Sequence, residues 1–528
     1  MRHLWYCVTL LVLGIFSADA VIGQVPAADA EGSPKPFAFA AIERRAKELG
    51  GRPYVPVTQA LPEFLEALDY GHYRDIRFRG DKSIWFGEGL PFQLQFFHRG
   101  GLYKDRIAIN LIDHGVSRAV PYSPGLFDFG ENEFPRVPSR DLGFAGFRIH
   151  GPQRKYGPYD EFAVFQGASY FRGASRLGPV YAISGPVYGI SARGLALDTG
   201  FPEPEEFPVF KEFWIEKPEP EREGESAGLT VYALLDSPSV AGAYRFVIHP
   251  GSDLSMEVKT RLFLRRGVRR FGIAPLTSMF FHGEHSDRHF DDFRPEVHDS
   301  DGLLIAARDG EWVWRPLNNP RRLATSVFAG TNVRGFGLMQ RDRDFEHYQD
   351  LASMYHARPS VWVEPVGKWG PGSVYLIEIP SDAEFYDNMV AFFVPDKTTA
   401  PGQAWSFDYR LKFLVSSPPA PPGGKAISTR AGASGAGLLD SSKRKFVIDF
   451  AGEALGDLSP EARVEPVLTA SSGRIIKPEI YKNLITGSWR LVFEFAPDPR
   501  HDPVDFRAYL RLGKQTLTET WIHQWSRP

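Results

Sequence analysis

Charged and aromatic side chains are concentrated together between positions 141 and 395. Strings such as GEWVWRPLNNP (310–320), RPSVWVEPVGKWGPG (358–372) and EIPSDAEFYDN (378–388) place aromatic rings beside Arg, Asp and Asn. A sugar ring stacks its C–H face on an aromatic ring, and its hydroxyls need paired donors and acceptors. The stretch as a whole is therefore compatible with carbohydrate binding. Each aromatic residue taken singly is better explained as part of a core.

Ten residues of this stretch are candidates for contact with a sugar, because their side chains are aromatic, cationic or amide groups. They are Tyr170, Arg172, Arg193, Arg294, Trp312, Trp314, Arg315, Trp362, Trp369 and Asn388.

Cleavage of a glycosidic bond would need two carboxyl groups. One is protonated and donates to the leaving oxygen, and the other activates water or attacks. Spacing along the chain does not choose among the candidates, and each one alone is better explained as a solvated surface group. The candidates are Asp291, Asp292, Glu296, Asp299, Asp301, Asp342, Asp344, Asp350, Glu378, Asp382, Glu384 and Asp387.

Other chemistries have weaker support in the sequence. His282, His285 and His289 lie close together, but neither an H-E-x-x-H motif nor a Cys/His ligand pattern accompanies them. Ser191 misses the G-x-S-x-G spacing of a nucleophile elbow, and no nucleotide-binding glycine motif is present. We therefore expect no metal and no cofactor.

Composition limits the partners of the chain. Its 528 residues include 61 Lys and Arg against 64 Asp and Glu, a formal net charge of −3. This balance gives no electrostatic reason to bind nucleic acid or an anionic membrane. High contents of Gly (51), Pro (43) and aromatic residues (14%) favour a turn-rich all-β protein.

The N-terminus carries the pattern of a secretory signal. Residues 1–20 combine a basic start, an apolar segment and the small-x-small sequence Ala18-Asp19-Ala20. The apolar segment is shorter than the roughly 20 residues of a membrane span, so we expect no stable membrane insertion. No twin-Arg pair precedes it, which favours Sec export. The only cysteine, Cys7, lies inside this segment, and an exported chain without cysteine favours the periplasm.

The remaining pattern predicts two β domains. Residues 21–35 resemble a flexible leader, and residues 37–50 and 61–70 are short helix candidates. Runs with period-two alternation, such as 92–97, 229–234, 244–248 and 373–379, indicate antiparallel strands, and no βαβ rhythm occurs. A segment rich in Pro, Gly, Ala and Ser (416–442) predicts a linker. We thus expect a large β domain at 36–415 and a small immunoglobulin-like sandwich at 443–528, with strands near 445–450, 488–495 and 516–523.

Long strings in the large domain resemble the periplasmic osmoregulated glucan biosynthesis protein G and D family. The similarity runs from about position 142 to 395, is looser before that and is weak after the linker at 416–442. The strings include LGFAGFRIH (142–150), YGISARGLALDTG (188–200), EEFPVFKEFWIEKP (205–218), FRPEVHDSDGL (293–303) and GFGLMQRDRDFEHYQD (335–350). The missing twin-Arg signal favours the G branch.

This resemblance implies a fold, a process and an activity. The large domain would be a β-sandwich of the galactose-mutarotase-like type, and the process would be synthesis of β-1,2-linked glucan in the periplasm. The activity would be that of an anomer-inverting glycoside hydrolase acting on the β-1,2-glucan backbone. A glucan-binding scaffold that cleaves nothing is the alternative, and an epimerase of the mutarotase type has support from the fold alone. The implied partners are β-1,2-linked glucan, with a homodimer or contact with the inner-membrane glucan synthase in addition.

The resemblance also implies roles for three residues. Asp387 would be the general acid and Asp299 the base, acting indirectly through a proton relay beside which Tyr355 lies. An inverting pair leaves room for a water molecule, with roughly 6.5–9.5 Å or more between the carboxyls. We expect a raised pKa for Asp387, caused by burial among Tyr386, Phe385 and Trp residues, and a counter-ion for Asp299 supplied by Arg294 or Arg315.

Overall fold

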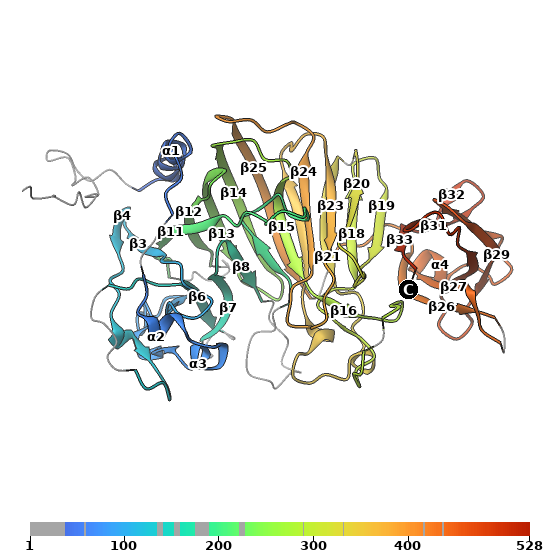
Figure 1. The fold of residues 1–528 in the computed structure, drawn as a ribbon, viewed down its shortest axis with the longest axis horizontal. Coiled ribbons are helices and arrows are strands. Elements are labelled where there is room, and N and C mark those ends of the chain that lie inside the picture. The colour runs from blue at the N-terminus through green and yellow to red at the C-terminus, as the bar shows by residue number, and fades with distance from the viewer. Residues whose placement is uncertain are drawn as a thin grey trace, which may run out of the picture.

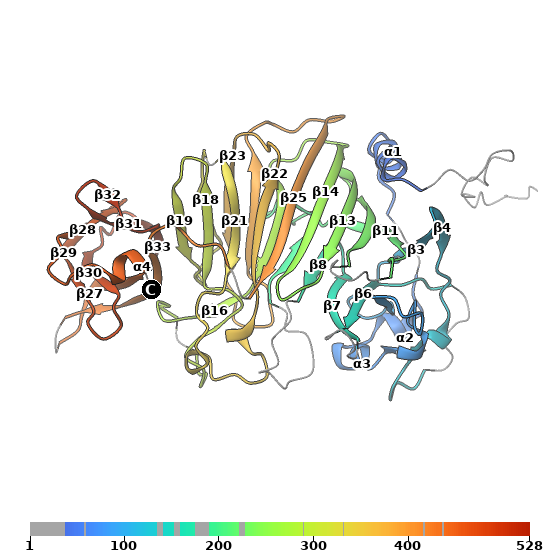
Figure 2. The same cartoon turned by 180° about the vertical axis from the view of Figure 1, so that it is seen from behind.

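Strands dominate the architecture (Figures 1 and 2), so the expected all-β class is confirmed. The computed structural model describes residues 37–527, apart from 57–59, 135–140, 153–158, 175–188, 221–226, 289, 331, 416–417 and 436–437. The expected signal peptide and leader lie outside the described residues. In the part of the chain that is described, no helix is both long and apolar enough to cross a membrane.

Two large sheets form the body of the molecule. The first has ten strands: β2 (Gln93–Phe97), β6 (Gly146–Pro152), β7 (Tyr159–Gln166), β8 (Tyr170–Gly173), β9 (Ser191–Arg193), β15 (Phe271–Ser278), β24 (Met389–Pro395), β23 (Gly372–Glu378) and β20 (Ala324–Phe328) in spatial order, with β10 (Leu195–Leu197) paired to β15.

The second sheet has fifteen strands and is almost entirely antiparallel. In spatial order they are β28 (Val464–Ala470), β31 (Val504–Leu512), β33 (Thr520–Trp525), β19 (Trp312–Pro316), β18 (Gly302–Ala307), β21 (Val333–Met339), β22 (Ser360–Val366), β25 (Ala404–Leu414), β14 (Leu254–Leu264), β13 (Val240–His249), β12 (Leu229–Asp236), β11 (Val209–Glu216), β3 (Ala108–Asp113) and β4 (Val116–Ala119), with β32 (Gln515–Thr516) paired to β31.

The smaller elements complete the fold. A four-stranded sheet contains β26 (Lys425–Ser434), β27 (Asp440–Ala451), β30 (Trp489–Ala496) and β29 (Arg474–Lys482), and two further pairs are β1 (Arg77–Phe78) with β5 (Phe127–Asp128) and β16 (Phe280–His282) with β17 (Val297–His298). The helices are α1 (Phe39–Gly50), α2 (Glu63–Glu66), α3 (Tyr70–Arg74) and α4 (Glu453–Gly456), with 3₁₀ turns η1 (Gly80–Lys82), η2 (Pro124–Leu126), η3 (Phe345–His347) and η4 (Tyr355–Ala357).

The main core lies between the two large sheets. Phe165 and Phe171 of the first sheet contact Phe246 of the second, with ring centroids 5.3 and 5.2 Å apart. Strand β14 alternates buried and more exposed residues along its length, as a strand with one covered face must. The other face of β12 and β13 is covered by α1, whose Ile42 and Ala46 are buried against them.

The C-terminal part of the chain extends the second sheet. Thr520 and Trp521 of β33 pair in parallel with Val313 and Trp314 of β19. The four-stranded sheet packs on this extension, and the rings of Phe446 and Phe506 lie 5.0 Å apart. Figure 1 shows this C-terminal unit beyond β19, at the end of the molecule opposite α1. The galactose-mutarotase-like and immunoglobulin-like types of the two parts stay predictions.

Three local expectations differ from the structure. The helix expected at 61–70 is split, because Asp69 has an extended backbone and its side chain accepts the backbone N–H of His72 to cap α3. Residues 425–434 were expected in the linker but form β26. Pairing with β27 satisfies their backbone hydrogen bonds and does not require large side chains. The strand expected at 516–523 is broken, and β33 begins at Thr520. The other expected strands and the helix at 37–50 are confirmed within a few residues.

Candidate functional site

Asp387 lies at the end of the loop that connects β23 to β24. Its neighbour Asn388 fixes this loop to β16: the Asn388 amide donates to the carbonyls of Phe280 (3.0 Å) and Ile379 (3.1 Å) and accepts the backbone N–H of Phe280 (2.9 Å). Asn388 is only 2% exposed. It therefore holds Asp387 in place and is not free to bind a sugar, which corrects the sequence-based assignment.

Asp387 carries an unusually basic carboxyl group. Burial raises its pKa to about 6, and the charge of Asp299 adds to the effect, while the guanidinium groups of Arg172, Arg193 and Arg358 oppose it. A raised pKa was expected, but Phe385 and Tyr386, which were expected to bury the carboxyl, are 67% and 63% exposed. Since these five charged groups interact, the fold gathers them from strands and loops far apart in the sequence.

Asp299 follows β17 and is 4% exposed. Its backbone N–H donates to the carbonyl of Met279 at 2.8 Å, and its carboxylate forms an ion pair with Arg358. The Arg358 guanidinium also lies over the ring of Tyr355, 4.3 Å from the centroid. The counter-ion of Asp299 is therefore Arg358, and not Arg294 or Arg315 as predicted.

Tyr355 begins the turn η4, and its hydroxyl donates to Glu384 Oε2 at 3.2 Å. Burial raises the pKa of this hydroxyl, with a further contribution from the charge of Asp299. Glu384 also accepts from Arg294 at 2.7 Å, and Arg294 in turn binds Asp292 and Asp350. Arg294 is thus saturated by carboxylates, and it acts on the site only through Glu384.

Three of the predicted sugar-binding residues do lie beside Asp387. Tyr170 and Arg172 come from β8, and Arg193 from β9. The Arg193 guanidinium lies 5.4 Å from the Tyr170 ring centroid and bonds Glu205 at 2.8 Å. Burial raises the pKa of Tyr170, Arg193 opposes this, and the Asp387 charge adds to it. Arg172 is exposed and can reach a ligand at this site.

The four tryptophans and Arg315 are elsewhere, which corrects their assignment. Trp312 stacks on Trp362 at 6.1 Å, and Trp314 lies under Arg341 at 3.6 Å, where the second sheet meets the C-terminal unit. Trp369 is 9% exposed and packs among Phe393, Phe407 and Tyr409. Arg315 is buried and bonds Glu378 at 2.9 Å. Trp314, Trp362, Trp369 and Arg315 are buried and serve the core, whereas Trp312 is only partly buried and also lines a cavity of about 400 Å³ beside β31 and β33.

The two described histidines of the group at 282–289 do not converge. His282 Nδ1 lies 3.2 Å from the carbonyl of Pro295, and His285 Nε2 lies 2.6 Å from that of Leu317. Residue 289 is outside the described residues.

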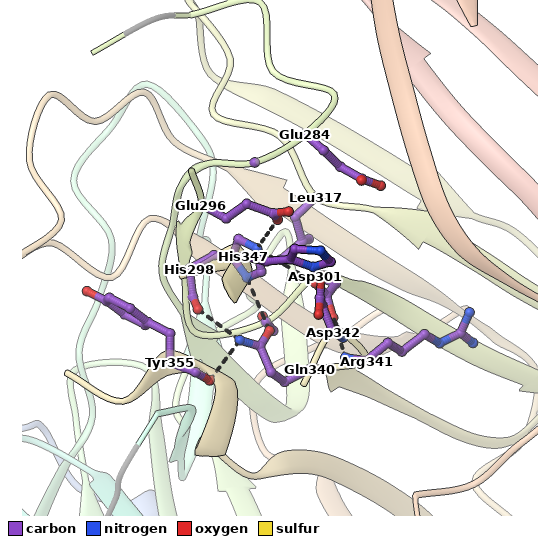
Figure 3. Close-up of polar contacts among 12 residues, drawn as sticks. Glu284, Glu296, His298, Asp301, Leu317, Gln340, Arg341, Asp342, His347 and Tyr355 are labelled. Atoms are coloured by element: carbon purple, nitrogen blue, oxygen red, sulfur yellow. Dashed lines mark hydrogen bonds and ion pairs between the residues drawn. The ribbon is translucent and has the colours of Figure 1, made fainter. Parts of the chain in front are cut away.

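A second polar cluster lies next to Asp299 and was not predicted as a unit (Figure 3). Glu296, His298 and Asp301 bring one ligand atom each within 4.8 Å of one another, and Glu296, Asp342 and His347 form a similar group. Burial lowers the pKa of His298, but the hydrogen bond to Glu296 and the charge of Asp301 outweigh it and raise the pKa to about 9. Burial raises the pKa of Asp301 to about 6. The string FRPEVHDSDGL (293–303) contains Glu296, His298 and Asp301. Their partners Asp342 and His347 follow about 40 to 50 positions later, so the sequence did not show that these side chains meet.

Comparison with known proteins identifies the family. Residues 37–525 match the model of the family described as periplasmic glucan biosynthesis protein, MdoG. The chain belongs to this family. It is 45% identical over 494 residues to glucans biosynthesis protein G of Ralstonia nicotianae, covering 92% of this chain and 95% of the relative.

Relatives named protein G and relatives named protein D are similar to this chain to about the same degree. Glucans biosynthesis protein D 1 of Ralstonia nicotianae is 43% identical over 521 residues, covering 94% of this chain and 93% of the relative. Glucans biosynthesis protein G of Vibrio cholerae is 42% identical over 485 residues, covering 92% of this chain and 86% of the relative. The resemblance seen in the sequence is thereby confirmed at the level of the G and D family.

Proposed function

We propose that this chain takes part in periplasmic glucan biosynthesis and acts there as an anomer-inverting glycoside hydrolase on a β-1,2-glucan backbone. The names of its relatives support the process, and the signal pattern at 1–20 supports a periplasmic location. The hydrolase activity, the β-1,2 linkage, a homodimer and contact with the glucan synthase are parts of the proposal.

One observation carries the hydrolase proposal. The Asp387 carboxyl, which is partly exposed, has a pKa raised to about 6 and lies within the electrostatic reach of the buried carboxylate of Asp299. A general acid must hold a proton near neutral pH, and burial is the usual means. Asp387 then donates its proton to the glycosidic oxygen as the bond to the anomeric carbon breaks.

The base assignment follows from the opposite environment. Asp299 is paired with Arg358 and lies beside Tyr355, so a proton from the attacking water would reach it through a relay rather than directly. Water attacks the anomeric carbon from the face opposite the leaving oxygen, which inverts the anomer. Tyr170 offers an aromatic ring to the sugar, and Arg172 an exposed guanidinium whose charge acts on Asp387.

The ion pair on Asp299 also gives specific support to the alternative. A carboxylate that is paired directly with a guanidinium is a weak proton acceptor. The pairing of Asp299 with Arg358 therefore suits a glucan-binding scaffold. Both functions require glucan affinity, but only the hydrolase requires turnover.

Incubation with linear β-1,2-glucan, followed by product sizing and optical rotation, distinguishes them. We expect shorter products whose optical rotation changes with time in the sense of an inverted anomer. Asp299→Asn should abolish most turnover and leave binding in place. Asp382→Asn is the matched control, because its side chain is 93% exposed in the same loop as Asp387. Unchanged polymer with measurable binding would favour the scaffold.

A further inference from the structure

The cluster beside Asp299 has the composition of a metal centre. Figure 3 shows the side chains of Glu296, His298 and His347 turned toward one another above Asp301. His298 Nε2 lies 2.9 Å from Glu296 Oε2 and 3.7 Å from Asp301 Oδ1. Ligand atoms about 2.1 Å from a tetrahedral ion are about 3.4 Å apart, and the two observed separations lie on either side of this value.

The tautomer of His298 is fixed by its other neighbour. The Gln340 amide nitrogen donates to the carbonyls of His298 (3.1 Å) and Tyr355 (3.0 Å), so its oxygen, 3.1 Å from His298 Nδ1, must accept from that nitrogen. Nδ1 therefore carries a proton, and Nε2 is the atom that faces the carboxylates. A histidine that binds a metal typically donates its other N–H to a carbonyl or carboxylate in this way.

The carboxylates of the cluster outnumber its fixed cations. Asp301 Oδ1 has no hydrogen bond among the described residues, and it lies 3.7 Å from His298 Nε2. Asp301 Oδ2 accepts the backbone N–H groups of Arg341 and Asp342. The Arg341 side chain is directed to Glu519, at 2.6 and 2.9 Å, and does not neutralise the cluster.

Space for an ion adjoins these ligand atoms. A cavity of about 40 Å³ is lined by Glu296, His298 and Asp301, together with residues of β26 such as Ser428 and Thr429. This volume holds one ion or a molecule of the size of water. The side chain of His298 is 1% exposed and that of Asp301 is 16% exposed, so the cluster is buried at His298 and reached by solvent at Asp301.

We propose that Glu296, His298 and Asp301 bind a divalent transition-metal ion, with Zn²⁺ as the representative. One imidazole and two carboxylates are donors that Zn²⁺ accepts, and the cavity leaves a fourth position open. The ion would join β17 to the start of β18 and so fix the segment that carries Asp299. This inference departs from the absence of metal expected from the sequence, and it does not depend on the proposed hydrolase activity.

Metal binding by the full chain tests the site. After treatment with a chelator and desalting, calorimetric titration with Zn²⁺ and elemental analysis should give one ion per chain. Glu296→Gln and Asp301→Asn, which preserve side-chain shape, should each weaken Zn²⁺ binding about 100-fold or more, beyond the 10–100-fold typical of an outer-shell partner. Asp382→Asn should bind as the wild type does.

Two results would overturn the proposal. One is no stoichiometric Zn²⁺ on the wild-type chain, which would leave His298 as a protonated partner of Glu296. The other is equal Zn²⁺ affinity in a folded Glu296→Gln or Asp301→Asn chain. If neither variant folds, the absorption spectrum of Co²⁺ added to the wild-type chain tests the site. We expect the visible d–d bands of a tetrahedral ion bound by nitrogen and oxygen. The spectrum of aqueous Co²⁺ would count against the site.

Discussion

Glu378 and Asp387 stand at the two ends of one loop and differ in how their charge is satisfied. Glu378 is buried with Arg315 at 2.9 Å and also accepts the backbone N–H of Asn318 at 2.8 Å. For Asp387, no hydrogen bond or ion pair is found among the described residues, and the surrounding guanidinium groups act on it from a distance. Burial raises the pKa of both carboxyls, but direct partners hold Glu378 in place, whereas Asp387 has none among the described residues and keeps its proton available for chemistry.

The largest effect should come from Asp387→Asn. If Asp387 is the general acid, turnover of β-1,2-glucan should fall about 10²–10⁴-fold, the usual contribution of acid–base catalysis. Steady-state kinetics with product sizing measures this. The free energy of unfolding should stay close to that of the wild type, because no direct partner is lost. Turnover within twofold of the wild type would remove Asp387 from the mechanism.

Arg315→Met should act on stability instead. This substitution leaves the Glu378 carboxylate buried without its counter-ion. The loss of the counter-ion should lower the free energy of unfolding by about 3–5 kcal/mol. Denaturant unfolding measures the loss. Adding Glu378→Gln should restore part of it, because the amide removes the charge and still accepts from Asn318. An Arg315→Met chain as stable as the wild type would contradict the contrast between the directly paired Glu378 and the unpaired Asp387.

A smaller effect is expected on the pH profile. The acid form of Asp387 is lost as the pH rises through its pKa of about 6, so turnover should decrease above that value. The Arg172 charge lowers this pKa, and Arg172→Gln should therefore shift the decrease to higher pH. The pH dependence of kcat measures the shift. Arg172→Lys keeps the charge and should leave the profile nearly unchanged; a shift to lower pH in Arg172→Gln would contradict the assignment.

The smallest effect should come from Trp369→Phe. Trp369 packs in the core, and its indole N–H donates to the carbonyl of Asp408 at 2.9 Å. The change should cost about 1 kcal/mol of stability through this hydrogen bond. Glucan affinity, measured by calorimetry, should stay within about twofold of the wild type. A large loss of affinity with unchanged stability would return Trp369 to the sugar site.

Some of this protein could be predicted from local sequence. Alternation in runs such as 229–234 and 244–248 predicts strands, because a strand exposes successive side chains to opposite faces. The strings between 142 and 395 were sufficient to identify the family. The neighbours of Asp387 were less informative, because Phe385 and Tyr386 were expected to bury it but are 67% and 63% exposed.

Other features depend on the tertiary structure. The same sequence offers Arg294, Arg315 and Arg358 as partners for Asp299, and only the packing of η4 beside β17 selects Arg358. Trp312, Trp314 and Trp362 have the composition of a sugar platform, yet all three pack where the second sheet meets the C-terminal unit, and Trp312 alone of the three stays partly exposed. Strand β26 exists because β27 pairs with it, although its composition is that of a linker.

The sequence by itself determined the strand pattern and the family, since both depend on residues that are neighbours along the chain. The tertiary structure decided which charges are neutralised and which are left for a ligand. The physical reason is that the pairing of a charge depends on distances of a few ångströms, and these are set by strands from distant parts of the chain.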